Sequence, residues 1–140
     1  MAEYTANAVQ TVSANQNVLF TDTPVSGNNS ILHREGSGLV TLRGITAQCR
    51  ARFKAIFSGN IAIPEGGAVA PISLALALNG EVVAPTTMIV TPAATENYFN
   101  VASAIYLDVP QGCCLQLSVV NTSTGAVLVQ NANLIVERVA

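Results

Sequence analysis

The sequence has few charged residues, no tryptophan and one histidine, and each shortage excludes a class of protein. Only 10% of the residues are charged while 50% are hydrophobic, and the net charge is −2. A net charge this small creates no long-range electrostatic field that would attract nucleic acid or a membrane surface. Three cysteines, of which Cys113 and Cys114 are adjacent, make a poor disulfide framework. We interpret them, with Cys49, as small apolar fillers.

Long apolar runs are also missing. The longest run, over positions 68–78, is interrupted by Pro71 and Ser73 and is far shorter than the ~20 residues of a membrane span. The first residues show no basic segment followed by an apolar one, so we expect no signal peptide and synthesis in a cytoplasm. The high apolar fraction excludes a disordered chain, and 140 residues fit one domain.

Alternation of β-branched or apolar residues with polar ones runs through the chain, with turn signals about every 8–15 residues. This pattern predicts an all-β fold of about eight to ten strands. Two antiparallel sheets packed as a β-sandwich, or a jelly roll, are the economical architecture. Beyond an opening segment at 7–20, the expected strands are 39–45, 46–63, 71–78, 81–83, 86–90, 98–109, 114–120, 126–129 and 134–139.

The segment from Thr46 to Ile63 fits two periodicities. Apolar residues recur at every fourth position from Ile45 to Phe57, which suits a helix. Strict alternation of charged and apolar residues also fits, and no convincing helix N-cap precedes the segment. We therefore predict a strand, with a bulge or bend at Gly59.

Turn signals place two hairpins. Asn-Gly at 79–80 lies between two apolar runs, and both residues accept a positive φ. A second hairpin is predicted between 114–120 and 126–129. Asn-x-Ser/Thr triplets begin at Asn28 and Asn121, and without a secretion signal we interpret them as turn chemistry rather than glycan acceptors.

Several predicted strands are apolar on both faces, whereas an ordinary sandwich strand shows water a polar face. Faces of alanine and aromatic residues allow a second sheet to approach closely, so we expect them to pack against other copies of the chain. The alternative is a thick core covered by the chain's own loops. The candidate interface residues are Ala75, Ala77, Ala102, Ala104, Tyr106, Leu134 and Val136.

Candidate catalytic residues are scarce. His33 lies in a Gly/Asn-rich loop, and as a general base it would need a nucleophile and an orienting acid. The eight carboxylates are spread singly, and no Gly-rich phosphate loop with its lysine is present. We therefore expect no enzymatic activity, no cofactor and no metal site, and we interpret His33 as a solvated loop residue.

One cluster of charge stands out, at Arg43, Arg50, Arg52 and Lys54. At period two, the last three of these line one face of a strand. The cluster is a candidate docking stripe for an acidic partner surface or an anion. The alternative is a solvated strand face that protects a sheet edge. Nucleic-acid binding would show more basic residues with interleaved aromatics.

From about Asn15 onward the chain resembles the TNF-like jelly roll, in the bacterial branch that forms the heads of collagen-like spore-surface glycoproteins and small structural proteins of bacteriophages. Four segments carry the resemblance: Arg52–Gly66, Ile72–Val82, Tyr106–Gly112 and Leu134–Ala140. The resemblance implies a compact homotrimer, which would explain strands that are apolar on both faces. It assigns no catalytic residue.

No Gly-x-y collagen stalk precedes the resemblance, so we expect residues 1–14 to form an N-terminal arm and 15–140 a single jelly-roll domain. The expected function is a homotrimeric capsid decoration or head-spike protein of a bacteriophage virion. Its arm or basic stripe would contact the major capsid protein or another particle surface, with no nucleic-acid or membrane partner. The alternatives are a head that binds a glycan receptor through loops 21–38 and 91–97, and a spore-surface layer protein.

Overall fold

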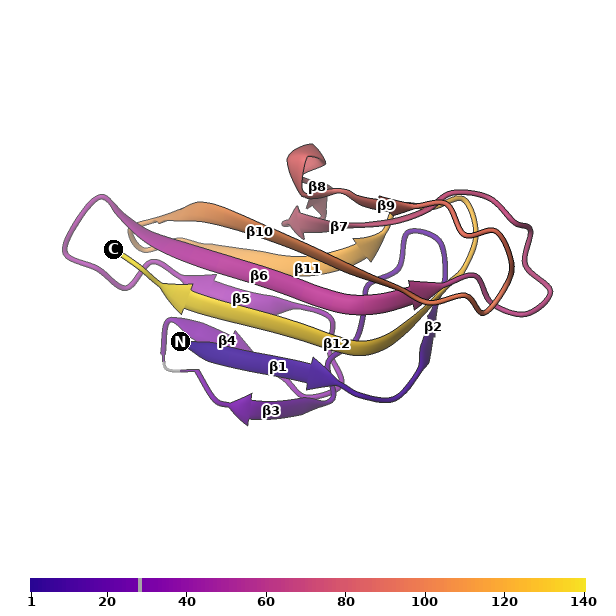
Figure 1. Cartoon of the computed structure of the whole chain (residues 1–140). Coiled ribbons are helices and arrows are strands. Elements are labelled where there is room, and N and C mark those ends of the chain that lie inside the picture. Colours follow the sequence, from indigo (N-terminus) through magenta and orange to yellow (C-terminus); the bar gives the residue numbers. More distant parts are fainter. Residues whose placement is uncertain (28) are drawn as a thin grey trace.

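A computed structural model describes residues 1–27 and 29–140, which form two six-stranded antiparallel sheets. Sheet A has the order β10-β6-β12-β1-β3, with β2 beside β12; sheet B has the order β4-β5-β11-β7-β8, with β9 beside β7 (Figure 1). The elements are β1 Ala2–Ala6, β2 Gln10–Val12, β3 Asp22–Val25, β4 Ile31–His33, β5 Val40–Arg43, β6 Arg50–Ala62, β7 Ile72–Leu78, β8 Glu81–Val82, the 3-10 turn η1 Ala84–Thr86, β9 Met88–Val90, β10 Phe99–Pro110, β11 Cys114–Asn121 and β12 Val127–Arg138.

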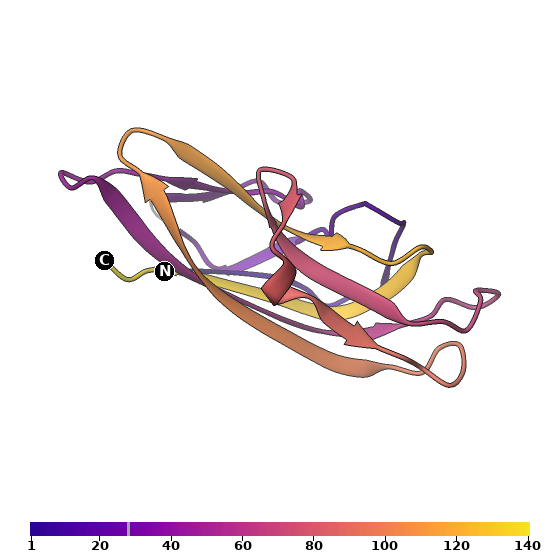
Figure 2. The same ribbon diagram turned by 90° about the horizontal axis from the view of Figure 1, so that it is seen from above.

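The jelly-roll sandwich expected from the sequence is confirmed. Figure 2 shows the sheets as two layers, with both chain termini at the same end. No helix in the described part of the chain is long and apolar enough to cross a membrane.

Strand β6 shows how alternation builds the core. Its odd positions, from Ala51 through Phe57 to Ile61, are buried between the sheets, while even positions such as Lys54 face outward. The Phe57 ring meets the ring of Phe20 edge-on, with centroids 6.4 Å apart. The strand interpretation of the ambiguous segment is therefore confirmed over Arg50–Ala62, because β6 pairs with β10 on one side and with β12 on the other.

The irregularity predicted at Gly59 lies on the neighbouring strand instead. Strand β6 pairs with β10 without interruption through Gly59, while the register with β12 shifts between Gln130 and Asn133. Asn131 there has a positive φ of 56°. A Cβ at Gly59 would lie 3.3 Å from Cζ of Phe57, a tight contact, and 3.5 Å from the Cα of Ala132, an ordinary one, so the glycine gives room to the Phe57 ring rather than to the bulge.

The two predicted hairpins have different outcomes. Asn79 and Gly80 adopt φ values of 52° and 82° and join β7 to β8, as predicted. The second hairpin is wrong, because β11 pairs with β5 and β7 in sheet B whereas β12 belongs to sheet A. Segments 126–129 and 134–139, predicted as separate strands, are parts of the single strand β12.

Asn121 ends β11 and connects the two layers. Its side chain is fully buried and donates to the carbonyls of Val12 and Gly125, both at 2.9 Å. Its Oδ1 accepts the N–H of Ser123 at 2.8 Å, so this triplet serves turn chemistry, as interpreted from sequence. Asn28, which begins the other triplet, lies outside the described residues.

The expectation of an N-terminal arm is wrong. Residues 2–6 form β1, which lies between β12 and β3 within sheet A. Ala2, Tyr4 and Ala6 are at most 3% exposed. The short segment alternates apolar and polar residues as a half-buried strand does, so it completes the sheet instead of projecting from the domain.

Candidate functional site

The candidate interface residues fall into two groups, and the first is buried inside the protomer. Leu134 and Val136 point from β12 into the core and are fully buried. Ala75 and Ala77 are at most 1% exposed. Ala77 lies between Ser118 of β11 and Val82 of β8, and larger neighbours on adjacent strands cover so small a side chain. The prediction is wrong for these four residues.

Ala102, Ala104 and Tyr106 form the second group and are exposed on the outer face of β10. Strand pairing extends this face across sheet A, since Ala104 pairs with Ile56 of β6, which in turn pairs with Ile135 of β12. Both isoleucines are half-buried. We call Ile56, Ala102, Ala104, Tyr106 and Ile135 the central patch. Its two alanines have short side chains, so they leave the backbone of β10 accessible.

The predicted basic stripe is shorter than expected and partly neutralised. Arg50 and Arg52 lie on the outer face of β6, at one end of the central patch, and both contact Asp108 of β10. Arg52 donates through Nε and Nη2 at 2.8 and 3.1 Å, and the Nε of Arg50 is 3.2 Å from Oδ2. Arg43 belongs to β5 of sheet B, where it donates to the carbonyl of Asn29 at 3.4 Å.

This cluster changes the protonation equilibria of its members. Hydrogen bonds from Arg52 hold the pKa of Asp108 below its usual range, and the charges of Arg52 and Arg50 act in the same direction. The same hydrogen bonds raise the pKa of Arg52. Asp108 therefore stays ionised and holds the two guanidinium groups in place.

Lys54 is the third cation on this face. It lies between Tyr106 of β10 and Glu137 of β12. Its Nζ is 5.8 Å from the centroid of the Tyr106 ring, which is within range of a cation–π interaction. Glu137 of β12 pairs with Lys54 on its other side. Beside them, Arg52, Tyr106, Leu107 and Asp108 line a shallow depression of about 270 Å³.

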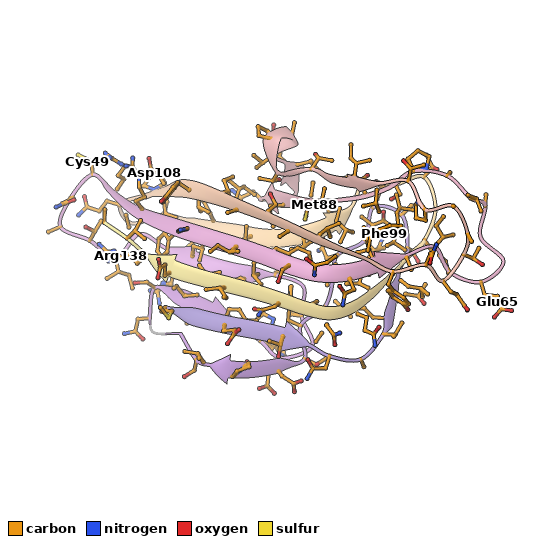
Figure 3. The ribbon with its side chains drawn as sticks, in the orientation of Figure 1. Cys49, Glu65, Met88, Phe99, Asp108 and Arg138 are labelled. Atoms are coloured by element: carbon orange, nitrogen blue, oxygen red, sulfur yellow. The ribbon has the colours of Figure 1, made fainter. Side chains whose placement is uncertain are left out.

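Arg138 belongs to the same end of the molecule, and the sequence analysis missed it. Strand β12 pairs with β6 and sets Arg138 opposite Phe53, and Arg138 Nη1 donates to the carbonyl of Ile45. Figure 3 shows Arg138 and Asp108 at one end of the sandwich, with Glu65 at the other. We call Arg43, Arg50, Arg52, Lys54 and Arg138 the basic end. Only the pairing of β6 with the C-terminal strand reveals it.

All three cysteines are at this end and are exposed, which corrects their interpretation as fillers. Gln111 donates its backbone N–H to the carbonyl of Cys49, and Gly44 donates to the carbonyl of Cys113, both at 2.9 Å. Cys114 pairs with Arg43. The thiols thus lie on adjoining, hydrogen-bonded segments.

His33 is a packing residue rather than a solvated one. Its ring is 4.4 Å from that of Tyr4 and 6.3 Å from that of Phe20, measured between centroids. Nε2 lies 2.8 Å from the carbonyl oxygen of Ser37. Because a carbonyl oxygen only accepts, Nε2 carries a proton in this contact. His33 on β4 of sheet B therefore packs against Tyr4 on β1 of sheet A and helps to hold the two sheets together.

Comparisons with known proteins agree with the architecture. No family model and no curated protein sequence matches the chain. The globular domain of zebrafish complement 1qA protein superposes with a TM-score of 0.63 at 13% identity, over 96% of this chain and 94% of that one. The sugar-binding EclA C-terminal domain (TM-score 0.42, 16% identity, 94% and 79% covered) and a family 35 carbohydrate-binding module from Clostridium thermocellum (0.35, 14%, 95% and 91%) superpose less closely. The first likeness shows the jelly-roll fold, and we draw no conclusion from the other two.

Proposed function

We propose that the chain is a non-enzymatic structural protein that forms a homotrimer through the central patch and decorates a larger particle, with a bacteriophage virion as its setting. The observation that carries the proposal is the exposed, nearly uncharged central patch on sheet A. The trimer and the particle follow from the family resemblance seen in the sequence.

The patch has the physical character of a self-association surface. Tyr106 is an aromatic residue that is 63% exposed. Aromatic residues are enriched where proteins contact each other, so its exposure indicates a contact surface. Ala102 and Ala104 present little relief, so a second sheet can approach the backbone closely. Full burial of an isoleucine contributes about 1.5–3 kcal/mol relative to exposure, so covering the remaining surface of Ile56 and Ile135 in each copy favours assembly.

A second candidate function is a receptor-binding head, and one feature favours it. At the end opposite the basic end, the loops over 63–72 and 123–126 surround a hollow of about 450 Å³ that includes Glu65, Ser123 and Thr124. The loop carrying Glu96 joins this region, because Glu96 donates its N–H to the carbonyl of Ile63 at 2.8 Å. A small ligand would fit a hollow of this size.

The oligomeric state tests the principal proposal. Sedimentation of the wild-type chain at low micromolar concentration is expected to give three times the 14.5 kDa chain mass. Ala104→Glu should give a folded monomer, because each copy would have to bury an unpaired carboxylate at its interface. The matched control is Ile89→Glu, since Ile89 is 65% exposed and belongs to β9 of sheet B, outside the patch.

Far-UV circular dichroism must show the same strand content for all three proteins. A wild-type chain that sediments as a monomer would refute the proposed self-association. Dissociation by Ile89→Glu with an intact Ala104→Glu trimer would move the interface to sheet B. Glycan binding that is lost on changing Thr124, in a chain that stays trimeric, would favour the receptor-binding alternative for the far end.

A further inference from the structure

Charge is distributed very unevenly over the molecule. The basic end holds five of the six Lys and Arg residues of the chain, and the side-chain carboxylates among them are those of Asp108 and Glu137. Arg138 Nε also donates to the backbone oxygen of Ala140 at 3.3 Å. Arg34 and six carboxylates make up the rest of the chain's charge. The nearest of these along sheet A is Glu3, which lies one strand beyond β12, opposite Ile135. A chain with net charge −2 therefore has one distinctly positive end.

The arginines at this end keep capacity for another anion. A guanidinium carries five N–H donors; Arg52 gives two to Asp108, and Arg50 forms an ion pair with Asp108 through Nε. Asp108 also fixes the orientation of both groups. The shallow depression beside them includes Arg52 and Asp108 in its lining, so an incoming carboxylate finds guanidinium N–H groups that Asp108 already holds in place.

We infer that the basic end is the surface that docks onto an acidic protein surface. The inference rests on the proposed function, because it names the chemistry of the particle surface and the end that faces it. Arginine recognises carboxylates in a two-pronged geometry, which Arg52 already shows with Asp108. A homotrimer presents three such ends, so weak individual contacts add up to stable docking.

A nucleic acid or an anionic membrane fits this end less well. A nucleic-acid duplex carries about one charge per 1.7 Å along its axis, so its phosphates would meet the carboxylates of Asp108 and Glu137 as well as the cations. Separate Asp and Glu side chains on a protein can instead pair with individual cations and avoid the interspersed carboxylates. Electrostatic complementarity of this discrete kind selects partners and orientation.

The test measures binding of the full-length chain to a flexible Gly/Ser peptide with well-spaced glutamates at low salt, with the native thiols as reporters. Binding should slow maleimide labelling of Cys49, Cys113 and Cys114, read by mass spectrometry. Arg43→Gln and Lys54→Gln should each weaken binding about two- to fivefold, as loss of an exposed ion pair does. Asp108→Asn should strengthen it by a similar factor, because it frees two arginines; unfolding cannot mimic such a gain.

Arg34→Gln is the matched control, since Arg34 is exposed and lies outside the basic end; it should bind as the wild type does. Equal losses of binding affinity in Arg34→Gln and Arg43→Gln would overturn the placement of the docking surface at the basic end. Thiols that stay reactive in the complex would overturn it as well. Tighter binding to a DNA duplex or to phosphatidylserine vesicles at the same salt would overturn the acidic protein as partner. Sedimentation of the same samples separates the two proposals: a monomer that binds the spaced-glutamate peptide refutes only self-association, and a trimer that does not bind refutes only docking.

Discussion

Replacing Tyr4 tests whether the first strand is part of the fold. Tyr4 is 2% exposed in the middle of β1, and its ring packs against His33 from sheet B. Strand β1 pairs with β12 over five residues, from Ala2 to Ala6. If β1 belongs to the core, Tyr4→Ala should behave as a core truncation. If the segment were a detachable arm, the same change would leave domain stability unaltered.

The expected size of the effect follows from the burial of the ring. Truncating a buried large aromatic residue to alanine costs about 3–5 kcal/mol, which is a large part of the roughly 5–15 kcal/mol that stabilises a typical domain. With a urea m-value of about 1–3 kcal/mol/M, the unfolding midpoint of Tyr4→Ala should fall by roughly 2 M. The chain has no tryptophan, so far-UV circular dichroism is the suitable probe.

Thr5→Ala is the control, because Thr5 is half-buried on the outer face of the same strand. A surface substitution of this kind changes the free energy of unfolding by about 0.5 kcal/mol. A loss below about 1 kcal/mol in Tyr4→Ala, similar to that of Thr5→Ala, would refute the assignment of β1 to the core and restore the arm.

Two further predictions concern single buried groups. Burial raises the pKa of Tyr4 above its ordinary value of 10.0, so the folded state favours the neutral phenol; the associated stability is present below pH 10 and is lost as pH rises through the folded-state pKa. Urea titrations should show this alkaline loss in the wild type and a smaller one in Tyr4→Phe, and identical slopes would exclude Tyr4 as its source. Asn121→Leu should lower the free energy of unfolding by about 2–4 kcal/mol, because each orphaned buried polar group costs about 1–3 kcal/mol; a loss under about 1 kcal/mol would mean that the carbonyls of Val12 and Gly125 find other partners.

Local pattern was sufficient for the long strands β6, β7, β10 and β11 and for one hairpin, but it missed β1 and β3 and divided β12 in two. The alternation in β6 and the Asn79-Gly80 pair are local signals, and the structure agrees with both. Long-range pairing has no such signal. Strands β11 and β12 follow each other closely in sequence but lie in different sheets, because the turn that starts at Asn121 crosses between layers, and its composition alone does not distinguish a crossing from a hairpin.

The basic end was only partly predictable for the same reason. Arg50, Arg52 and Lys54 stand close together in the sequence and share the face that alternation predicts. Arg138 joins them only because β12 returns along β6, and Asp108 neutralises part of the cluster only because β10 pairs on the other side. Sequence spacing identifies cations on one strand, whereas the charge of a surface depends on all the strands that cross it.

Alanine residues show why an apolar second face does not by itself indicate an interface. Ala77 and Ala104 both alternate with larger residues on their strands, yet Ala77 is 1% exposed and Ala104 is open to solvent. Strand β7 has neighbours on both sides, whose side chains cover Ala77, while β10 is the edge strand of sheet A. The same residue type is therefore a core filler in an interior strand and a contact candidate at an edge. The low charge of the chain argues for self-association only through those apolar residues that the protomer leaves exposed. Single exposed apolar residues such as Leu32 and Ile89 also occur on sheet B, whereas the outer face of β10 and β6 brings several together on paired strands.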